Sequence, residues 1–231
     1  MDSDLRQRML HYYDERASEY EEAFTSGTGT SSMTNSAIFK TEAIALADIV
    51  RRFAKGSLID LACGTAYWLP NYAGQCSSIT LFDQSEKMLE ESRKKVRALE
   101  IVDRCSIIQG DFFDYSFAFN AYDCALVGFL LTHLTESQEG ELFDKLRTML
   151  VPNGRFLILD SAWSPEREKF NAKVERQARR LNDGTHFDIY KKYCDQDDIS
   201  FWPQKYQVTI RIEYFQSAFF AVSGSFTPNG S

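Results

Sequence analysis

Five short segments that are almost continuously apolar recur along this chain, and helical spacing of apolar residues marks several of the stretches between them. A strand in which nearly every residue is apolar has both faces buried, as the strands of parallel sheets do. Parallel strands need crossover connections, and these are right-handed. The pattern therefore predicts a doubly wound α/β fold with a mostly parallel sheet. The five expected strands are 57–62, 78–83, 105–111, 122–131 and 155–160.

Hydrophobic periodicity predicts the remaining elements. Helices are expected over 4–24, 37–53, 85–99 and 137–150, with a loop rich in Gly, Ser and Thr over 25–36. Beyond Pro165 the sequence becomes strongly charged, and we expect a helix over 166–184 and a short extended piece over 186–193. Two closely spaced strand-like stretches, 206–215 and 217–225, predict an antiparallel hairpin at the sheet edge, which brings the sheet to seven strands.

The composition excludes some classes of function. The 231 residues are 44% hydrophobic, enough for a large core, and carry a formal net charge of −7. Nucleic-acid-binding domains usually present a basic surface, so we expect no nucleic-acid partner. No apolar stretch approaches the ~18 residues of a membrane-spanning helix, and the start of the chain lacks a signal-peptide core. The five cysteines lack C-x-x-C spacing, and we interpret them as free thiols of a soluble, cytoplasmic protein.

The loop after the first expected strand reads DLACGTA, residues 60–66. Ligands of doubly wound sheets bind beyond the carboxyl ends of the strands. Small residues at positions 62, 64 and 66 allow a ligand to approach the backbone closely, and an ordinary tight strand-to-helix turn is the alternative. The dinucleotide-binding pattern G-x-G-x-x-G is absent, because Gly64 is the only glycine of this loop.

Carboxylates lie at the ends of three expected strands, at Asp60, Asp83 and Asp111. A carboxylate at the end of the second strand can accept both hydroxyls of a ribose. Asp111 can accept from an adenine amino group while the neighbouring Phe112 packs on the ring, and Asp60 suits an ammonium group. Together they predict a site for a neutral or positively charged nucleoside rather than for a pyrophosphate.

Five motifs occur in the order expected of class I S-adenosylmethionine-dependent methyltransferases: LIDLACGTAYW, ITLFDQSEKML, IIQGDFFDY, YDCALVGFLLTHL and LRTMLVPNGRFLILD. Over roughly residues 10–225 the chain resembles this family, which implies a Rossmann-like methyltransferase fold and S-adenosyl-L-methionine as the cofactor. The family's first motif usually has a third glycine where this chain has Ala66, and we expect an alanine to be tolerated if its φ is negative. The segment LHYYDERASEYEEAF resembles the N-terminal lid helix of small-molecule methyltransferases.

The resemblance also implies a layout and a set of site residues. We expect one domain over 1–231, with a lid helix and mobile loop in 1–36, a cofactor-binding core in 37–160, and a substrate-side helix and C-terminal strands in 161–231. The implied cofactor-binding residues are Tyr13, Arg16, Asp60, Ala62, Gly64, Thr65, Trp68, Asp83, Gln84, Met88, Asp111, Phe112 and Gly128. The implied substrate-binding residues are Tyr20, Phe129, His133 and Lys191. Packing of an amphipathic helix is the alternative for the lid residues, and a solvated face is the alternative for the lysines.

His133 follows the fourth expected strand, where this fold places the transferable methyl group. A neutral imidazole there can accept a proton from a hydroxyl nucleophile, and capping of the helix beyond Thr135 is the alternative role. The segment NDGTHFDIYKKY resembles small-molecule O-methyltransferases that act on a phosphonate. Asp188, however, stands where such an enzyme would need a basic residue, so a small carboxylic or hydroxy acid is favoured over a doubly charged phosphonate.

We therefore expect a methyltransferase that acts on an oxygen of a small, anionic metabolite, with His133 as the catalytic residue. We expect no metal and no membrane partner, and a monomer or a homodimer. Transfer to nitrogen or carbon, and a protein that binds the cofactor without turnover, are the alternatives.

Overall fold

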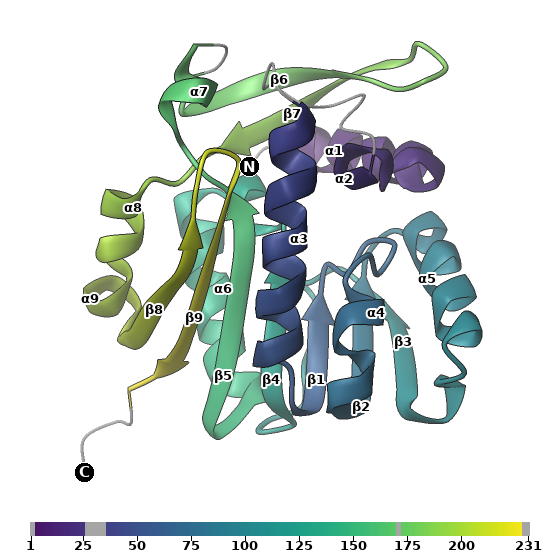
Figure 1. Cartoon of the computed structure of the whole chain (residues 1–231), viewed down its shortest axis with the longest axis vertical. Coiled ribbons are helices and arrows are strands. Elements are labelled where there is room, and N and C mark those ends of the chain that lie inside the picture. Colours follow the sequence, from purple (N-terminus) through teal and green to yellow (C-terminus); the bar gives the residue numbers. More distant parts are fainter. Residues whose placement is uncertain (1–2, 26–35, 170–171, 228–231) are drawn as a thin grey trace.

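The computed structural model describes residues 3–25, 36–169 and 172–227, and its main feature is a seven-stranded sheet (Figure 1). The strand order is β3-β2-β1-β4-β5-β9-β8. Strands β1 to β5 run parallel, whereas β9 is antiparallel to both β5 and β8. The strands are β1 Gly56–Leu61, β2 Cys76–Asp83, β3 Cys105–Gln109, β4 Tyr122–Gly128, β5 Leu150–Ser161, β8 Val208–Phe215 and β9 Phe219–Phe226. The predicted doubly wound sheet with an antiparallel edge hairpin is confirmed.

Helices cover both faces of this sheet, because alternate side chains of each strand point to opposite faces. In β1, Leu58 packs on the side of the long helix α3, and Ile59 packs on the side of α6. The α-helices are α1 Ser3–Arg16, α2 Glu22–Thr25, α3 Ser36–Phe53, α4 Leu69–Tyr72, α5 Glu86–Ala98, α6 Glu136–Met149, α7 Pro165–Glu168, α8 Gln196–Ser200 and α9 Trp202–Tyr206. No helix in the described part of the chain is long and apolar enough to span a lipid bilayer.

Local sequence explains where the two helices nearest the strand ends begin. The Ser85 side chain accepts a hydrogen bond from the Met88 amide at the start of α5. Thr135 and Gln138 form a reciprocal capping box at the start of α6. The N-terminal helix is shorter than expected: α1 ends at Arg16, and a 3₁₀ turn over Ala17–Glu19 separates it from α2. Most of the predicted mobile loop, 26–35, lies outside the described residues.

The helix expected over 166–184 is wrong. Among the described residues of that range only those of α7 are helical, and β6 Val174–Arg180 pairs antiparallel with β7 His186–Lys192 in a separate hairpin. The hairpin lies beyond the carboxyl ends of the parallel strands, at the top of Figure 1, where α1 packs on it. The buried contact between α1 and the hairpin is formed by Leu5, Met9, Tyr12, Leu181 and Ile189. The expectation fails because β6, whose own sequence is mostly polar, pairs with β7, and β7 packs against α1.

The loop after β1 differs from its expected backbone. Ala66 has a φ of +54°, so the condition under which we expected an alanine to be tolerated, a negative φ, is not met. Ala62 and Gly64 are also left-handed, with φ of +53° and +56°. A left-handed alanine costs about 1–2 kcal/mol relative to a right-handed one. Hydrogen bonds hold the loop in this form, from the Ala66 amide to the Cys63 carbonyl (2.8 Å) and from the Cys63 amide to the Phe82 carbonyl (3.1 Å).

Three of the five cysteines and the Asp60 carboxyl group are buried. All five cysteines are free thiols, as expected, and three of them are buried. Asp60, on β1, is 2% exposed and accepts a hydrogen bond of 2.7 Å from the Tyr72 hydroxyl. Burial raises the pKa of Asp60 to about 7, and the nearby Asp83 carboxylate acts in the same direction, while the Tyr72 hydroxyl opposes both.

The raised pKa of Asp60 makes folding stability depend on pH. Between its unfolded pKa and about 7 the folded chain binds more protons at this position than the unfolded chain, so the free energy of unfolding falls as pH rises through that window. We predict that Asp60→Asn raises the free energy of unfolding at pH 8 by about 1–3 kcal/mol and has little effect at pH 5. Urea unfolding at the two pH values measures the difference. Asp103→Asn, at an exposed position, is the control, and an equal effect of Asp60→Asn at both pH values would contradict the assignment.

Candidate functional site

A cavity opens at the carboxyl ends of β1, β2 and β4, and α1 forms one of its walls. It encloses about 910 Å³, a volume that includes space open to solvent. Nine of the predicted cofactor-binding residues line it: Tyr13, Ala62, Gly64, Asp83, Gln84, Met88, Asp111, Phe112 and Gly128. We call this space the first cavity. The topology of the sheet explains the grouping, because the loops that follow parallel strands meet at the same edge.

Asp83 ends β2 on the wall of the first cavity and is 8% exposed. Its carboxylate accepts hydrogen bonds from the backbone amides of Gly64 (2.8 Å) and Ser85 (2.9 Å). Burial raises the pKa of Asp83, and these two hydrogen bonds oppose the rise. The carboxylate therefore has a fixed orientation toward the cavity, with lone pairs available for hydroxyl groups of a ligand.

Asp111 lies across the first cavity and has a partner that the sequence did not reveal. Arg6, on α1, forms an ion pair with the Asp111 carboxylate, and its guanidinium lies 5.3 Å from the centre of the Phe113 ring. The Asp111 carboxylate also accepts from the Phe113 amide (2.9 Å). Helical periodicity gives no signal for Arg6, because the contact depends on how α1 docks.

Further polar contacts join the N-terminal helices to α5. The Ser85 hydroxyl donates to the Asp14 carboxylate, and Lys87 forms a 2.7 Å ion pair with Glu15. Glu21 pairs with Lys95 and accepts from the Thr65 hydroxyl. The N-terminal helices thus cover the first cavity, in the position of the expected lid.

Four residues that the sequence assigned to the cofactor do not line the first cavity. The Thr65 hydroxyl is bound to Glu21, and Asp60 lies buried behind the loop against Tyr72. Trp68 packs edge-on against Phe24 with ring centres 6.0 Å apart. Arg16 faces a different space, described next. The cofactor-binding roles of these four residues stay predictions.

A second cavity, of about 600 Å³ including space open to solvent, lies next to the first. The two cavities share four residues: Tyr13, Tyr20, Phe129 and His133. Four cationic side chains line the second cavity, namely Arg16, Arg167, Arg179 and Lys191. No carboxylate occurs among its described lining residues. A site of this composition attracts anions.

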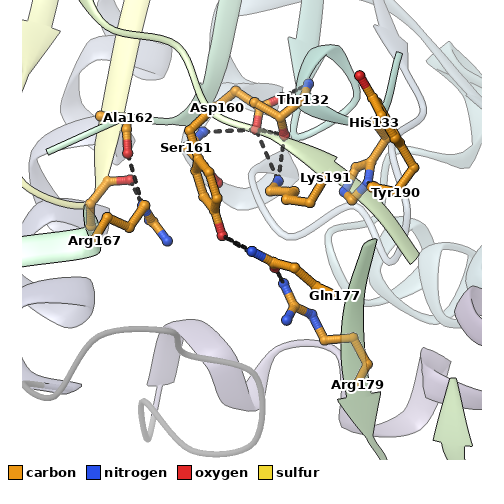
Figure 2. A network of polar contacts seen from close by, with 12 residues as sticks. Thr132, His133, Asp160, Ser161, Ala162, Arg167, Gln177, Arg179, Tyr190 and Lys191 are labelled. Atoms are coloured by element: carbon orange, nitrogen blue, oxygen red, sulfur yellow. Dashed lines mark hydrogen bonds and ion pairs between the residues drawn. The ribbon is translucent and has the colours of Figure 1, made fainter. Parts of the chain in front are cut away.

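Lys191 is one of the buried cations of this cavity (Figure 2). It lies on β7, is 6% exposed, donates to the Thr132 hydroxyl, and places its ammonium 3.5 Å from the Asp160 carboxylate. Asp160 is fully buried and also accepts from the backbone amides of Thr132 (3.0 Å) and Ser161 (2.7 Å). Burial lowers the pKa of Lys191, and the Asp160 carboxylate opposes that effect.

The two arginines from the charged segment reach the second cavity from different elements. Arg167, at α7, donates to the carbonyls of Ala162 (2.8 Å) and Ala218 (2.9 Å). Arg179 lies on β6 and donates to the Gln177 side chain (Figure 2). In the sequence these two arginines stand out only as part of a charge run, and the helix expected over 166–184 would place them differently.

Asp188 does not lie where the sequence suggested. It is exposed, pairs across the hairpin with Ala178, and lines neither cavity. Side chains alternate along β7, so Ile189 and Lys191 point inward while Asp188 points outward. The argument that Asp188 disfavours a doubly charged substrate is therefore wrong.

His133 lies in the 3₁₀ turn Leu131–His133 after β4, on the wall shared by the two cavities. Its Nε2 is 2.8 Å from the Tyr13 hydroxyl, and its Nδ1 is 2.9 Å from the Tyr190 carbonyl. Burial lowers the pKa of His133 well below its usual value, and Lys191 adds to the effect. The alternative role as a helix cap is wrong, because Thr135 caps α6.

Known proteins resemble this chain in part of its sequence and in its fold. Residues 58–154 match the family described as methyltransferase domain. The chain is 29% identical over 106 residues to the ubiquinone/menaquinone biosynthesis C-methyltransferase UbiE of Haemophilus ducreyi, covering 45% of this chain and 40% of that protein. It is 33% identical over 106 residues to UbiE of Blochmanniella pennsylvanica, covering 45% of this chain and 41% of that protein. The matched region thus spans about two fifths of these relatives.

Solved structures extend the likeness to the whole fold. The DhpI-SAM-HEP complex superposes with a TM-score of 0.78 at 21% identity, covering 97% of this chain and 99% of that one. The glycopeptide N-methyltransferase MtfA superposes with a TM-score of 0.58 at 14% identity, covering 78% of this chain and 90% of that one. Residues 58–154 thus match a methyltransferase domain, as the sequence motifs predicted, and the solved structures share the fold of the chain.

Proposed function

We propose that this chain is an S-adenosylmethionine-dependent methyltransferase that methylates an oxygen of a small anionic acceptor. The observation that carries the proposal is the pair of adjoining cavities, one lined by Asp83 and Asp111 and the other lined by four cations with no carboxylate among its described lining residues. His133 and Tyr13 lie on the wall between them, where the methyl group would pass.

The first cavity suits the cofactor. Solved relatives support this assignment, since DhpI was solved with SAH and MtfA with S-adenosylmethionine. In this chain Asp83 would accept the ribose hydroxyls, and Asp111, beside Phe112, would accept from the adenine amino group. The cofactor supplies an electrophilic methyl group on a sulfonium. The protein aligns the acceptor oxygen with that methyl group and excludes water, which is how binding energy accelerates such a displacement.

The second cavity suits the acceptor. Cationic side chains taken out of water are costly unless an anion or hydrogen-bond acceptors compensate them. An acceptor with one or two negative charges supplies that compensation through charge-assisted hydrogen bonds. Because Asp188 is outside the cavity, a phosphate or phosphonate group is as acceptable as a carboxylate.

Transfer to carbon is the second candidate, since the curated relatives are named C-methyltransferases. A large apolar acceptor, however, would bring no negative charge to the four cations of the second cavity. Incubation with methyl-labelled S-adenosylmethionine and panels of oxyacid and phenolic acceptors, followed by identification of the methylated atom, separates the two. Methylation of phenolic ring carbons alone would overturn the proposal for oxygen.

We predict that Asp83→Ala weakens the binding of S-adenosylhomocysteine by about 1.5–3 kcal/mol, because a charge-assisted hydrogen bond is lost. Isothermal calorimetry measures the affinity, and circular dichroism checks that the loop anchored by Asp83 still folds. Asp83→Asn keeps the shape and should lose less. Asp103→Ala is the exposed control. Unchanged affinity in folded Asp83→Ala would contradict the ribose assignment.

We predict that Arg179→Gln raises the acceptor KM roughly 10- to 100-fold, the scale of a lost hydrogen bond to a charged group. Arg180→Gln is the matched control, because the next residue on β6 is exposed and lines neither cavity. Steady-state methyl transfer to the oxyacids active with the wild type gives both constants. Equal KM values for the two variants would remove the support for an anionic acceptor in this cavity.

A further inference from the structure

Tyr13 and His133 form a contact that joins three elements at the wall between the cavities. Tyr13 comes from α1, His133 from the turn after β4, and the Tyr190 carbonyl that holds His133 comes from β7. The Tyr13 ring meets the imidazole edge-on, with ring centres 5.7 Å apart. The sequence suggested His133 as the base, but its two nitrogens are already engaged by these two partners.

The hydrogen bonds have a defined direction. A backbone carbonyl only accepts, so the 2.9 Å contact with Tyr190 requires a proton on His133 Nδ1. A neutral imidazole then has a bare Nε2, and the Tyr13 hydroxyl must donate to it across 2.8 Å. The Tyr13 oxygen keeps its lone pairs for another donor, while His133 has no free lone pair for a substrate.

We propose that Tyr13 is the residue that accepts the proton of the acceptor's hydroxyl group and passes its own phenolic proton to His133. This inference rests on the proposed function and narrows it. The reacting atom is then a neutral hydroxyl oxygen, and the acceptor's separate anionic group binds the cations of the second cavity. The substrate class is a small hydroxy acid anion or a phosphorylated or phosphonylated alcohol.

The proposed step balances in atoms and charge. The acceptor O–H bond breaks as its proton goes to the Tyr13 oxygen, and the Tyr13 O–H bond breaks as that proton goes to His133 Nε2. The acceptor oxygen forms a bond to the cofactor's methyl carbon, and the carbon–sulfur bond breaks with its electron pair left on sulfur. The positive charge of the sulfonium is replaced by that of the His133 imidazolium, which releases its proton to water after the products leave.

We call this transfer of protons from the acceptor to Tyr13 and from Tyr13 to His133 the relay. The charges around His133 link the relay to whether an anion occupies the second cavity. The titratable and charged groups that face it are Tyr13 and Arg16 from α1, Tyr20 from the following turn, Arg179 from β6, Lys191 from β7 and, beyond Lys191, Asp160 from β5. Burial, with the cations adding to it, lowers the pKa of His133 and keeps it neutral in the empty protein. An anionic group bound among them would stabilise the imidazolium, so His133 can take up the proton once the acceptor is in place.

Nitrogen-15 NMR of the histidine-labelled protein tests the direction of the hydrogen bonds without any turnover. The chain has three histidines, and His133→Gln identifies the signals of His133. At pH 8 we expect a protonated Nδ1 and a bare Nε2, and Tyr13→Phe should shift the Nε2 signal. Inorganic phosphate, as a probe anion, should raise the titration midpoint of His133. A protonated Nε2 in the neutral ring would overturn the relay.

Kinetics tests the catalytic role. With the hydroxy acids and phosphorylated alcohols that the wild type methylates, Tyr13→Phe should lower kcat about 10²- to 10⁴-fold, the usual contribution of general acid–base catalysis. Its affinity for S-adenosylhomocysteine should stay within threefold. Tyr67→Phe, which removes a phenol outside both cavities, should leave kcat unchanged. The wild-type kcat should fall as pH falls through the pKa of His133 in the complex, and Tyr13→Phe should lose this limb.

The outcomes separate this inference from the proposed function. A Tyr13→Phe variant that raises the acceptor KM but keeps kcat would make Tyr13 a binding residue and overturn the relay, while methyl transfer itself would stand. A wild type that methylates only acceptors without a hydroxyl group would also overturn it. If the wild type transfers no methyl group to any acceptor, the proposed function fails, and the NMR measurement still decides whether Tyr13 donates to His133.

Discussion

Asp160 holds together the part of the molecule on which both cavities depend. At the carboxyl end of β5 it accepts hydrogen bonds from the amides of Thr132 and Ser161 and from the Thr132 hydroxyl, and Lys191 lies 3.5 Å away. A buried carboxylate is tolerated only with such partners, and loss of one charged partner typically costs about 3–5 kcal/mol. These contacts attach the turn that contains His133 to the end of β5. They also attach β7 to this turn and to β5 (Figure 2).

The same arrangement explains how the second cavity holds four cations. Amide and hydroxyl donors already hydrogen-bond to the Asp160 carboxylate. The carboxylate therefore does not depend on Lys191 alone for compensation of its charge. Arg167 is held by the carbonyls of Ala162 and Ala218, and Arg179 by the side-chain amide of Gln177. These neutral acceptors fix a guanidinium without cancelling its charge. The cavity is therefore rigid and positively charged at the same time, which is the condition for selective binding of an anion.

The main sheet and much of the first cavity could be predicted because they depend on local pattern and topology. Burial on both faces makes each parallel strand continuously apolar, and strand ends such as Asp83 then meet at one edge. The strand β6 could not be predicted in this way, because it is polar on both faces: Arg179 points inward and Arg180 outward, without the apolar alternation of an ordinary strand. Asp188 lies on β7, in the piece that was expected to be extended, but the sequence does not show which face of that strand points into the cavity. The contact of Arg6 with the first cavity depends on docking of α1, which no local pattern encodes.

Helix α1 connects the chemistry of the two cavities. Arg6 lies in the first cavity, Tyr13 at the shared wall and Arg16 in the second, a separation of ten residues or roughly 15 Å of helix. The apolar face of α1 packs on the β6–β7 hairpin, which carries Arg179 and Lys191. A movement of α1 alone would expose this apolar contact to water. An opening of α1 would therefore be expected to move the hairpin that carries Arg179 and Lys191 with it. In the proposed reaction one closure therefore covers the cofactor, positions the proton acceptor and encloses the anion, and the charges that develop during methyl transfer meet fixed dipoles instead of water.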